Sequence, residues 1–233
     1  MAGSSKIDDS SPLRVTHPDR SASIVDLRQL LAERFPQPLI PFGPRFATGF
    51  PPLDEAMGGG LPKNAITELS SPQVSAGSAL LLQALLQSAH HGGSFFALVD
   101  GRDSFDPQPL GNRRLRNLLW VRCTKALDAV KAADLLLRDG NFPLVVLDLV
   151  LNAAQELRKI PQTSWYRLQR LVENAPTACL VLTRASIVSS AQLKLLLDQA
   201  WTLDDLEQDR LPGRFKIVVQ RVQGGREAGT KAG

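Results

Sequence analysis

The stretch that most constrains the fold of this chain is residues 65–86, AITELSSPQVSAGSALLLQALL. It starts with a short apolar run that suits a strand, continues through a small polar loop, and ends in a leucine-rich segment with helical spacing. A strand, a loop and a helix in this order form the repeating unit of α/β proteins. We therefore expect the central sheet to be built around this segment.

Most of the remaining chain repeats the same alternation. Apolar runs predict strands at 95–100, 117–121, 144–148 and 178–183, and helical spacing predicts helices at 126–139, 165–174 and 189–200. Two last strands are expected at 201–206 and 214–222, and the second alternates enough to be an antiparallel or edge strand. The pattern predicts an α/β fold, with a mostly parallel sheet and helices on both faces.

The chain is expected to have three parts. Residues 1–44 comprise a polar, flexible tail, a short helix with Ile24, Leu27, Leu30 and Leu31 on one face, and a proline-rich linker. Residues 45–222 form the α/β core, and residues 223–233 form a disordered tail. The short helix can fold back on its own core or dock on a partner, and the sequence favours neither.

The charge pattern leaves a nucleic-acid partner open. The formal net charge is +4, and the segments 107–127 and 210–226 contain basic residues without any acidic one. The candidate contacts for DNA or a protein partner are Arg113, Arg114, Arg116, Arg214, Lys216 and Arg221. An ordinary solvated surface explains these residues equally well.

Other sequence features predict where the protein acts. The two cysteines, Cys123 and Cys179, fall in apolar runs, so buried free thiols are expected and a metal site is not. The sequence has no apolar run long enough to span a membrane and no secretion signal at its start. We therefore expect a cytoplasmic protein without a membrane partner.

The loop after the first strand has the position of a phosphate-binding loop but lacks its chemistry. A working loop, G-x-x-x-x-G-K-[ST], uses a lysine to neutralise the phosphates and a hydroxyl to hold magnesium. With Gly77 as the second glycine of the motif, Ser78 and Ala79 hold the lysine and Ser/Thr positions, and Ser71, one residue earlier than the motif spacing requires, is taken for the first glycine. No Lys or Arg occurs between Asn64 and Gly101. We expect an ordinary turn with Ser75 as the N-cap and Gly77 early in the helix. A bare helix N-terminus that accepts an anion stays an alternative.

Three segments resemble the RecA-type recombinase core. TGFPPLDEAMGGGLPKNAITEL (48–69) resembles the segment that leads into the first RecA strand, LVDGRDSFDP (98–107) resembles the strand and loop after the first helix, and FPLVVLDLV (142–150) resembles the Walker B strand. The resemblance extends over about residues 45–222 and implies a RecA-like fold.

The departures from the RecA pattern imply a degenerate nucleotide site. Asp100, Asp106 and Asp148 match RecA positions, but the lysine, magnesium-hydroxyl and catalytic glutamate positions hold Ser78, Ala79 and Arg102. Losing all three groups implies a protein that is not an enzyme and has no cofactor or metal. The short connections after Asp148 and Arg184 also put recombinase-type DNA binding in doubt.

A shortened, nucleotide-degenerate RecA-like core resembles the ImuA family. That resemblance implies an adaptor in DNA damage-induced, error-prone translesion synthesis, with an ImuB-type polymerase-like subunit and RecA as partners. Three alternatives stay open: a cell-division inhibitor similar to SulA, a divergent ATP-binding recombinase paralogue that uses Asp148, and a plain DNA-binding module.

Overall fold

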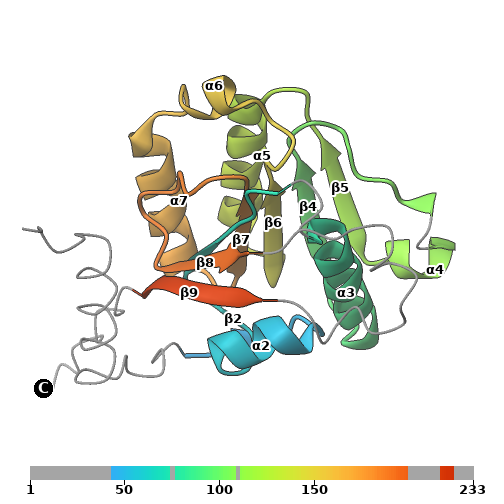
Figure 1. Ribbon diagram of the computed structural model, residues 1–233. Coiled ribbons are helices and arrows are strands. Elements are labelled where there is room, and N and C mark those ends of the chain that lie inside the picture. Colours follow the sequence, from blue (N-terminus) through green and yellow to red (C-terminus); the bar gives the residue numbers. More distant parts are fainter. Residues whose placement is uncertain (1–42, 74–76, 109–110, 199–215, 223–233) are drawn as a thin grey trace, which may run out of the picture. The chain divides into compact units, whose positions relative to one another are not determined.

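The computed structural model describes residues 43–73, 77–108, 111–198 and 216–222, all within the compact unit Leu39–Gly233 (Figure 1). Several expectations therefore lie outside the described residues. These are the tail, the short helix with Ile24, Leu27, Leu30 and Leu31, the linker before Gly43, the strand at 201–206, Arg214 and the tail 223–233.

A seven-stranded sheet forms the centre of the core, in the order β5-β4-β6-β7-β3-β8-β9. All neighbouring pairs are parallel except β8 and β9, which are antiparallel at one edge. This confirms the expected α/β fold, a RecA-like core with a mostly parallel sheet and an antiparallel edge strand near the C-terminus. The strands are β3 (Ile66–Ser70), β4 (Phe96–Asp100), β5 (Leu118–Arg122), β6 (Leu144–Asp148), β7 (Ala178–Thr183), β8 (Leu193–Leu197) and β9 (Ile217–Val222).

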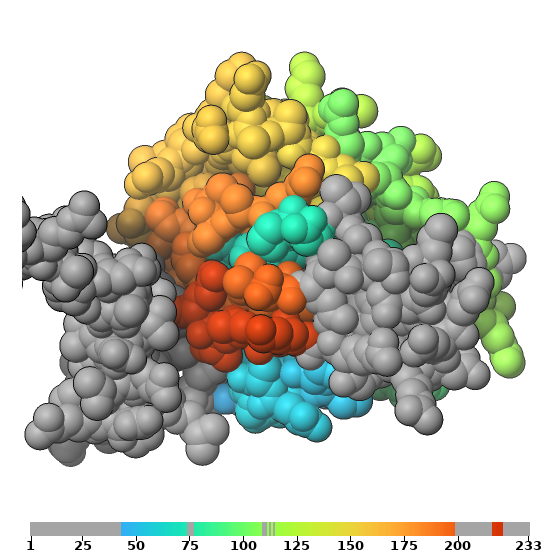
Figure 2. Space-filling model, viewed as in Figure 1, coloured from blue at the N-terminus to red at the C-terminus, as the bar shows by residue number. Residues whose placement is uncertain are grey.

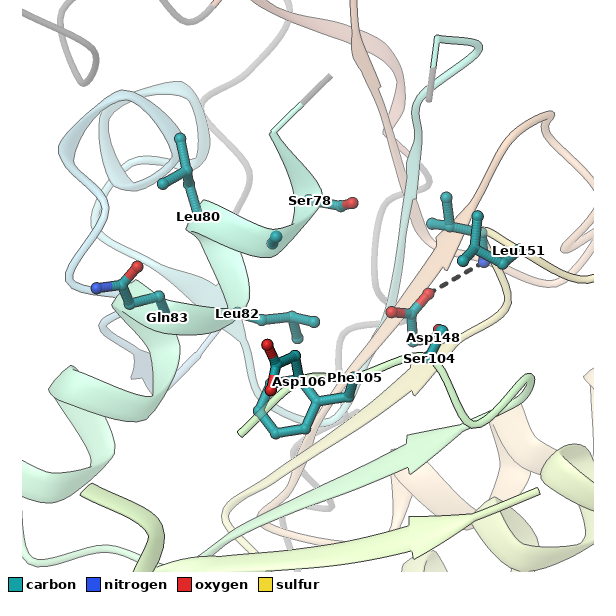
Figure 3. Close-up of a pocket in the computed structure, with 11 residues that line it drawn as sticks. Ser78, Leu80, Leu82, Gln83, Ser104, Phe105, Asp106, Asp148 and Leu151 are labelled. Carbon is teal, nitrogen blue, oxygen red and sulfur yellow. Dashed lines mark hydrogen bonds between the residues drawn. The ribbon is translucent and has the colours of Figure 1, made fainter. Parts of the chain in front are cut away.

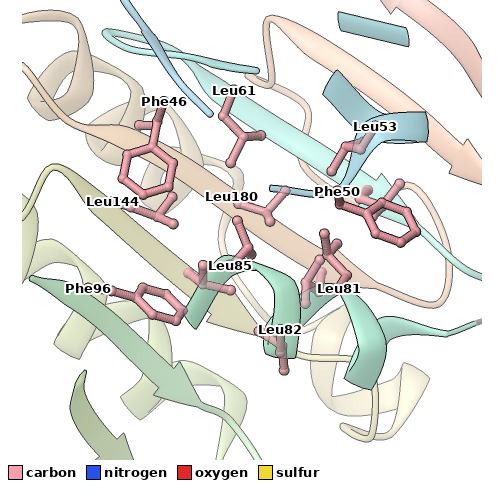
Figure 4. Close-up of a cluster of buried hydrophobic side chains, with 14 of the residues drawn as sticks. Phe46, Phe50, Leu53, Leu61, Leu81, Leu82, Leu85, Phe96, Leu144 and Leu180 are labelled. Atoms are coloured by element: carbon pink, nitrogen blue, oxygen red, sulfur yellow. The ribbon is translucent and has the colours of Figure 1, made fainter. Parts of the chain in front are cut away.

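Helices cover both faces of the sheet, as the sequence predicts. Helices α2 (Pro51–Met57) and α3 (Ser78–His91) pack their leucines against one face, in a cluster that includes Leu85, Phe96 and Leu180 (Figure 4). Helices α5 (Ala126–Asp139) and α7 (Gln162–Glu173) cover the other face. Two short helices, α4 (Gly111–Leu115) and α6 (Ala154–Leu157), lie in the connections. Strands β3, β4, β6 and β7 are buried on both faces, as is typical of the centre of a parallel sheet.

The segment before β3 contains a helix that is not among the predicted elements. Pro51 and Pro52 begin α2, and Gly58 ends it in the left-handed conformation with φ of 71°. Asp54 accepts hydrogen bonds from the backbone N–H and the hydroxyl of Thr48, at 3.0 and 2.8 Å. The segment is closed by a two-stranded antiparallel sheet of β1 (Arg45–Phe46) and β2 (Leu61–Pro62).

The last glycine of the run 58–60, Gly60, is required by the local backbone geometry. Its φ is 127°, and a Cβ added there would lie 2.4 Å from the carbonyl oxygen of Phe46. A side chain at this position would therefore separate the two short strands.

In the space-filling view α2 lies on the surface beside β9 (Figure 2).

The helix predicted at 189–200 is wrong over its central part, because Leu193–Leu197 forms β8 between β3 and β9. Leucine and lysine favour helices, so local propensity gives a misleading signal here. The segment alternates instead between buried and half-buried residues, and Gln192 accepts a 2.8 Å hydrogen bond from the backbone N–H of Ile66. Pairing with β3 thus overrides helix propensity.

Candidate functional site

The parallel strands bring their carboxyl ends to one edge of the sheet, where ligands bind in such folds. Ser70 of β3 lies opposite Thr183 of β7, and Asp100 of β4 lies opposite Asp148 of β6. Arg184, directly after β7, donates a 3.4 Å hydrogen bond to the carbonyl oxygen of Pro72. The structure therefore gathers the start of the loop after β3, both aspartates and Arg184 at this edge.

A pocket of about 350 Å³ opens here between the start of α3 and the ends of β4 and β6 (Figure 3). Its two carboxylates are Asp106 and Asp148, and Ser78 and Ala79 line it from the first turn of α3. The other lining residues are Leu80, Leu82, Gln83, Ser104, Phe105, Val150 and Leu151. The described lining residues include no Lys, Arg or His.

The start of α3 differs from the sequence prediction. Gly77 is the N-cap, in the left-handed conformation with φ of 95°, and the helix starts at Ser78. The prediction of Gly77 inside the helix is therefore wrong, and Ser75 lies outside the described residues. The cause is conformational, because glycine adopts positive φ without the strain that a side chain brings.

Ser71 does not offer its backbone to a phosphate. Its N–H donates a 2.8 Å hydrogen bond to the carbonyl oxygen of Thr183, and its hydroxyl lies 3.4 Å from the same oxygen. The side chain is buried. The loop residue at the first glycine position thus extends the pairing between β3 and β7.

Asp100 is a buried anchor for the loop that follows β4. Its carboxylate accepts hydrogen bonds from the backbone N–H groups of Arg102, Ser104 and Phe105, at 3.2, 2.8 and 2.8 Å. The Ser104 hydroxyl and the Trp120 indole N–H add bonds of 3.3 and 3.4 Å. These donors satisfy the buried carboxylate, and the loop they hold carries Phe105 and Asp106 to the pocket.

Arg102, at the catalytic glutamate position of the RecA pattern, lies outside the pocket lining. Its side chain is exposed, and its Nη1 donates a 3.2 Å hydrogen bond to the carbonyl oxygen of Thr124. Arginine has no acceptor and stays protonated, so it cannot orient a water molecule as a carboxylate does. The described contacts of Arg102 therefore tie the loop after β4 to the start of α5.

The pKa of Asp148 is raised by its surroundings. Burial raises its pKa to about 6, while a hydrogen bond from the backbone N–H of Val150 lowers the pKa and the charge of Asp100 raises it further. The bond from Val150 is 3.0 Å long. A nearby cation would lower the pKa of this carboxyl, but the described lining residues supply none.

Two supporting residues escape the sequence analysis. The Asn152 side chain donates a 2.9 Å hydrogen bond to the carbonyl oxygen of Gly101, and a Cβ added at Gly101 would lie 2.4 Å from Asn152 Oδ1. Gly101 thus lets β4 approach the end of β6, which sets Asp100 beside Asp148. The glycine directly after Asp100 is the sequence signal that points to this approach.

A buried ion pair beneath this edge also escapes prediction. Glu68 on β3 contacts Lys194 on β8 at 3.0 Å, with side-chain exposures of 1% and 14%. Glu68 also accepts hydrogen bonds from the backbone N–H groups of Ile187 and Val188, at 2.6 and 3.0 Å, and from the hydroxyl of Ser186 at 2.9 Å. The pair fixes the connection between β7 and β8.

The described residues of the two basic segments lie at opposite edges of the sheet. Arg113 and Arg116 are exposed next to edge strand β5, whereas Lys216 is exposed beside edge strand β9. The side chains of Arg114 and Arg221 lie outside the description. Arg122, in the first basic segment, pairs with Asp103 at 2.5 Å and lies 4.9 Å from the Trp120 ring centroid. The described basic residues do not form one continuous surface.

The expectation of buried free thiols holds for Cys179 but only in part for Cys123. Both are unpaired; Cys179 is buried and Cys123 is half-buried. Burial raises the pKa of the Cys179 thiol to about 12. Within the described residues, no cluster of three His, Cys, Asp or Glu side chains is placed to hold a metal ion, and no helix is long and apolar enough to cross a membrane.

Comparison with known proteins relates part of this chain to RecA. RecA of Acinetobacter baumannii and RecA of Acinetobacter baylyi are each 38% identical to it over 108 residues, which is 45% of this chain and 30% of each RecA. RecA of Xylella fastidiosa is 35% identical over 106 residues, which is 44% of this chain and 30% of that RecA. The similarity thus spans less than a third of the RecA length. No protein-family model matches the chain.

Proposed function

We propose that this protein is a catalytically inactive, RecA-like accessory protein of the DNA damage response, which acts as an adaptor in error-prone translesion synthesis. The observation that carries the proposal is the pocket at the carboxyl edge of the sheet. Ser78 and Ala79 occupy the positions of the phosphate-binding lysine and the magnesium hydroxyl, and the charged groups in the described lining are Asp106 and Asp148.

Phosphoryl transfer depends on the groups that this pocket lacks. The enzyme must neutralise the phosphates, hold magnesium and position the attacking water, and each such group contributes about 3 kcal/mol to transition-state stabilisation. Arg102 replaces the water-orienting glutamate and contacts Thr124. The loss of all three groups together therefore supports the proposal that this protein hydrolyses ATP no faster than the uncatalysed background.

The adaptor role rests on the resemblance to ImuA and on the partial similarity to RecA. Because the similarity covers 30% of each RecA, RecA's own activities are not carried over to this chain. We propose an ImuB-type polymerase-like subunit and RecA as protein partners. The exposed valines Val218 and Val219 on edge strand β9 are candidate contacts for such a partner.

Isothermal titration calorimetry with MgATP on the full chain tests the absence of a nucleotide function. We expect no binding heat and no thermal stabilisation at millimolar MgATP, with a RecA protein as the positive control. Micromolar binding, or ATP turnover that the Asp148→Asn substitution abolishes, would contradict the proposal and favour a divergent ATP-binding paralogue.

A pull-down with a purified ImuB-type subunit tests the adaptor role. We expect co-migration with the wild-type chain and weaker retention of the Val218→Asp/Val219→Asp variant. Leu135→Asp is the matched control, because Leu135 is 68% exposed on α5, away from β9. If the chain binds neither an ImuB-type subunit nor RecA in these experiments, the adaptor role is contradicted, even if MgATP does not bind.

A further inference from the structure

We propose that the pocket lined by Ser78, Phe105, Asp106, Asp148 and Leu151, here called the acidic pocket, binds an arginine or lysine side chain carried by an apolar segment of a partner protein. The inference rests on the proposed function, because a pocket that held MgATP would not accept a cationic side chain. It deepens that function by giving the chemistry that a partner must present.

The first argument is charge. Both charged groups in the described lining are carboxylates. Arg184 lies at the same edge, but its guanidinium donates to the carbonyl oxygen of Pro72 and is not part of the lining. The chain also has no Lys or Arg between Asn64 and Gly101, the stretch that contains the start of α3. The pocket therefore attracts a cation and repels a phosphate.

The second argument is unused hydrogen-bonding capacity. A carboxylate has about four acceptor positions, and among the described residues Asp148 receives one hydrogen bond, from the N–H of Val150. Asp106 receives one from the N–H of Gln108, at 2.9 Å. A guanidinium presents five donors in a planar fork that matches carboxylate oxygens, so it fits this arrangement better than a neutral group does.

The third argument is the apolar wall around the acids. Leu82, Phe105 and Val150 line the pocket, and Leu151 at its rim is 49% exposed (Figure 3). The stems of Arg and Lys cover apolar surface while the charged head reaches a polar group. The volume of about 350 Å³ is at the lower end of the range of about 300–1,000 Å³ for ligand pockets, which suits a side chain and its neighbours.

The test is an NMR titration of the full chain with hexylguanidinium, which combines an apolar chain with the head group of arginine. We expect amide shifts at Ser78, Phe105 and Leu151, and affinity about fivefold weaker in Asp106→Asn and in Asp148→Asn. Asp106 is exposed, so its variant keeps the fold. Asp128→Asn is the matched control, because Asp128 is an exposed acid on α5 and is expected to change nothing.

The other outcomes are separable. No shift with hexylguanidinium, or equal shifts with uncharged hexanol, would overturn the inference. If the Arg226→Gln/Lys231→Gln variant binds hexylguanidinium several-fold more tightly than the wild type, the inference is also overturned. The acidic pocket would then be occupied by C-terminal cations of the same chain and not by a partner. MgATP is titrated in parallel: shifts of the same amides by MgATP would refute the proposed function itself, whereas silence with both probes refutes the inference alone.

Discussion

At the scale of single residues, the three acids that match the RecA pattern differ in what surrounds them. Asp100 is enclosed by donors from the loop after β4 and acts as its anchor. Asp106 is exposed and caps the backbone of Gln108. Asp148 faces the pocket, receives a hydrogen bond from Val150 and has a pKa of about 6. The three acids thus have different surroundings, although all three match the RecA pattern.

The Asp148→Asn substitution is expected to stabilise the protein at neutral pH. The pKa of Asp148 is raised from 3.8 to about 6 in the folded state. Protonation of this acid therefore stabilises the folded state; the stabilisation is complete below about pH 4 and is lost as the pH rises through about 6. Asparagine does not titrate and still accepts from Val150. We expect a gain of about 1–2 kcal/mol in the free energy of unfolding near pH 7.5, and none near pH 4.

Urea unfolding of both proteins at the two pH values measures this effect. Asp128→Asn, at an exposed position on α5, controls for the loss of one negative charge. A destabilised Asp148→Asn protein at neutral pH would mean that the carboxylate has a cationic partner in solution.

At the scale of elements, the segments that resemble RecA hold secondary structure together. Thr48 and Asp54 fix the start of α2, and Gly60 allows β1 and β2 to pair. Glu68 binds the connection between β7 and β8. These contacts need no nucleotide, which explains how the resemblance persists in this part of the chain while Ser78 and Ala79 depart from it.

The Glu68–Lys194 pair is expected to show strong coupling in a double-mutant cycle. Lys194→Met leaves a buried carboxylate without its cation and should cost about 3 kcal/mol of unfolding free energy. Glu68→Gln/Lys194→Met removes both charges and should cost less than the sum of the single changes. Lys131→Met, which removes an exposed lysine paired with Asp128, should cost under about 1 kcal/mol. Additive single effects would show that the pair is not formed in solution.

At the scale of the whole molecule, the strand order sets which surfaces are open. Among the described strands, β3, β4, β6, β7 and β8 have neighbours on both sides, while β5 and β9 form the edges. The described basic residues next to β5 and β9 are therefore separated by the width of the sheet. One DNA strand that contacted both groups of described residues would have to pass around the core, so the placement of these residues gives no support to a direct DNA role.

Amide hydrogen exchange is expected to follow the same order. The central strands should exchange only by global unfolding, because their backbone groups pair on both sides in a buried layer. Residues 218–220 of β9 are exposed and should exchange faster by about two orders of magnitude or more. Slow exchange over Leu193–Leu197 is the critical observation, since rapid exchange there would contradict the place of β8 between β3 and β9.

The sequence by itself determined the α/β class, most strands and helices, and the absence of the phosphate-loop lysine and hydroxyl. These features depend on local periodicity and residue identity, which need no knowledge of distant contacts. Tertiary structure alone decided that residues 193–197 form a strand, because pairing with β3 outweighs the helix propensity of leucine. It also decided that Arg102 lies outside the pocket and that Asp106 and Asp148 share it. Such placements depend on strand order and loop anchors, and the spacing of residues along the chain does not encode them.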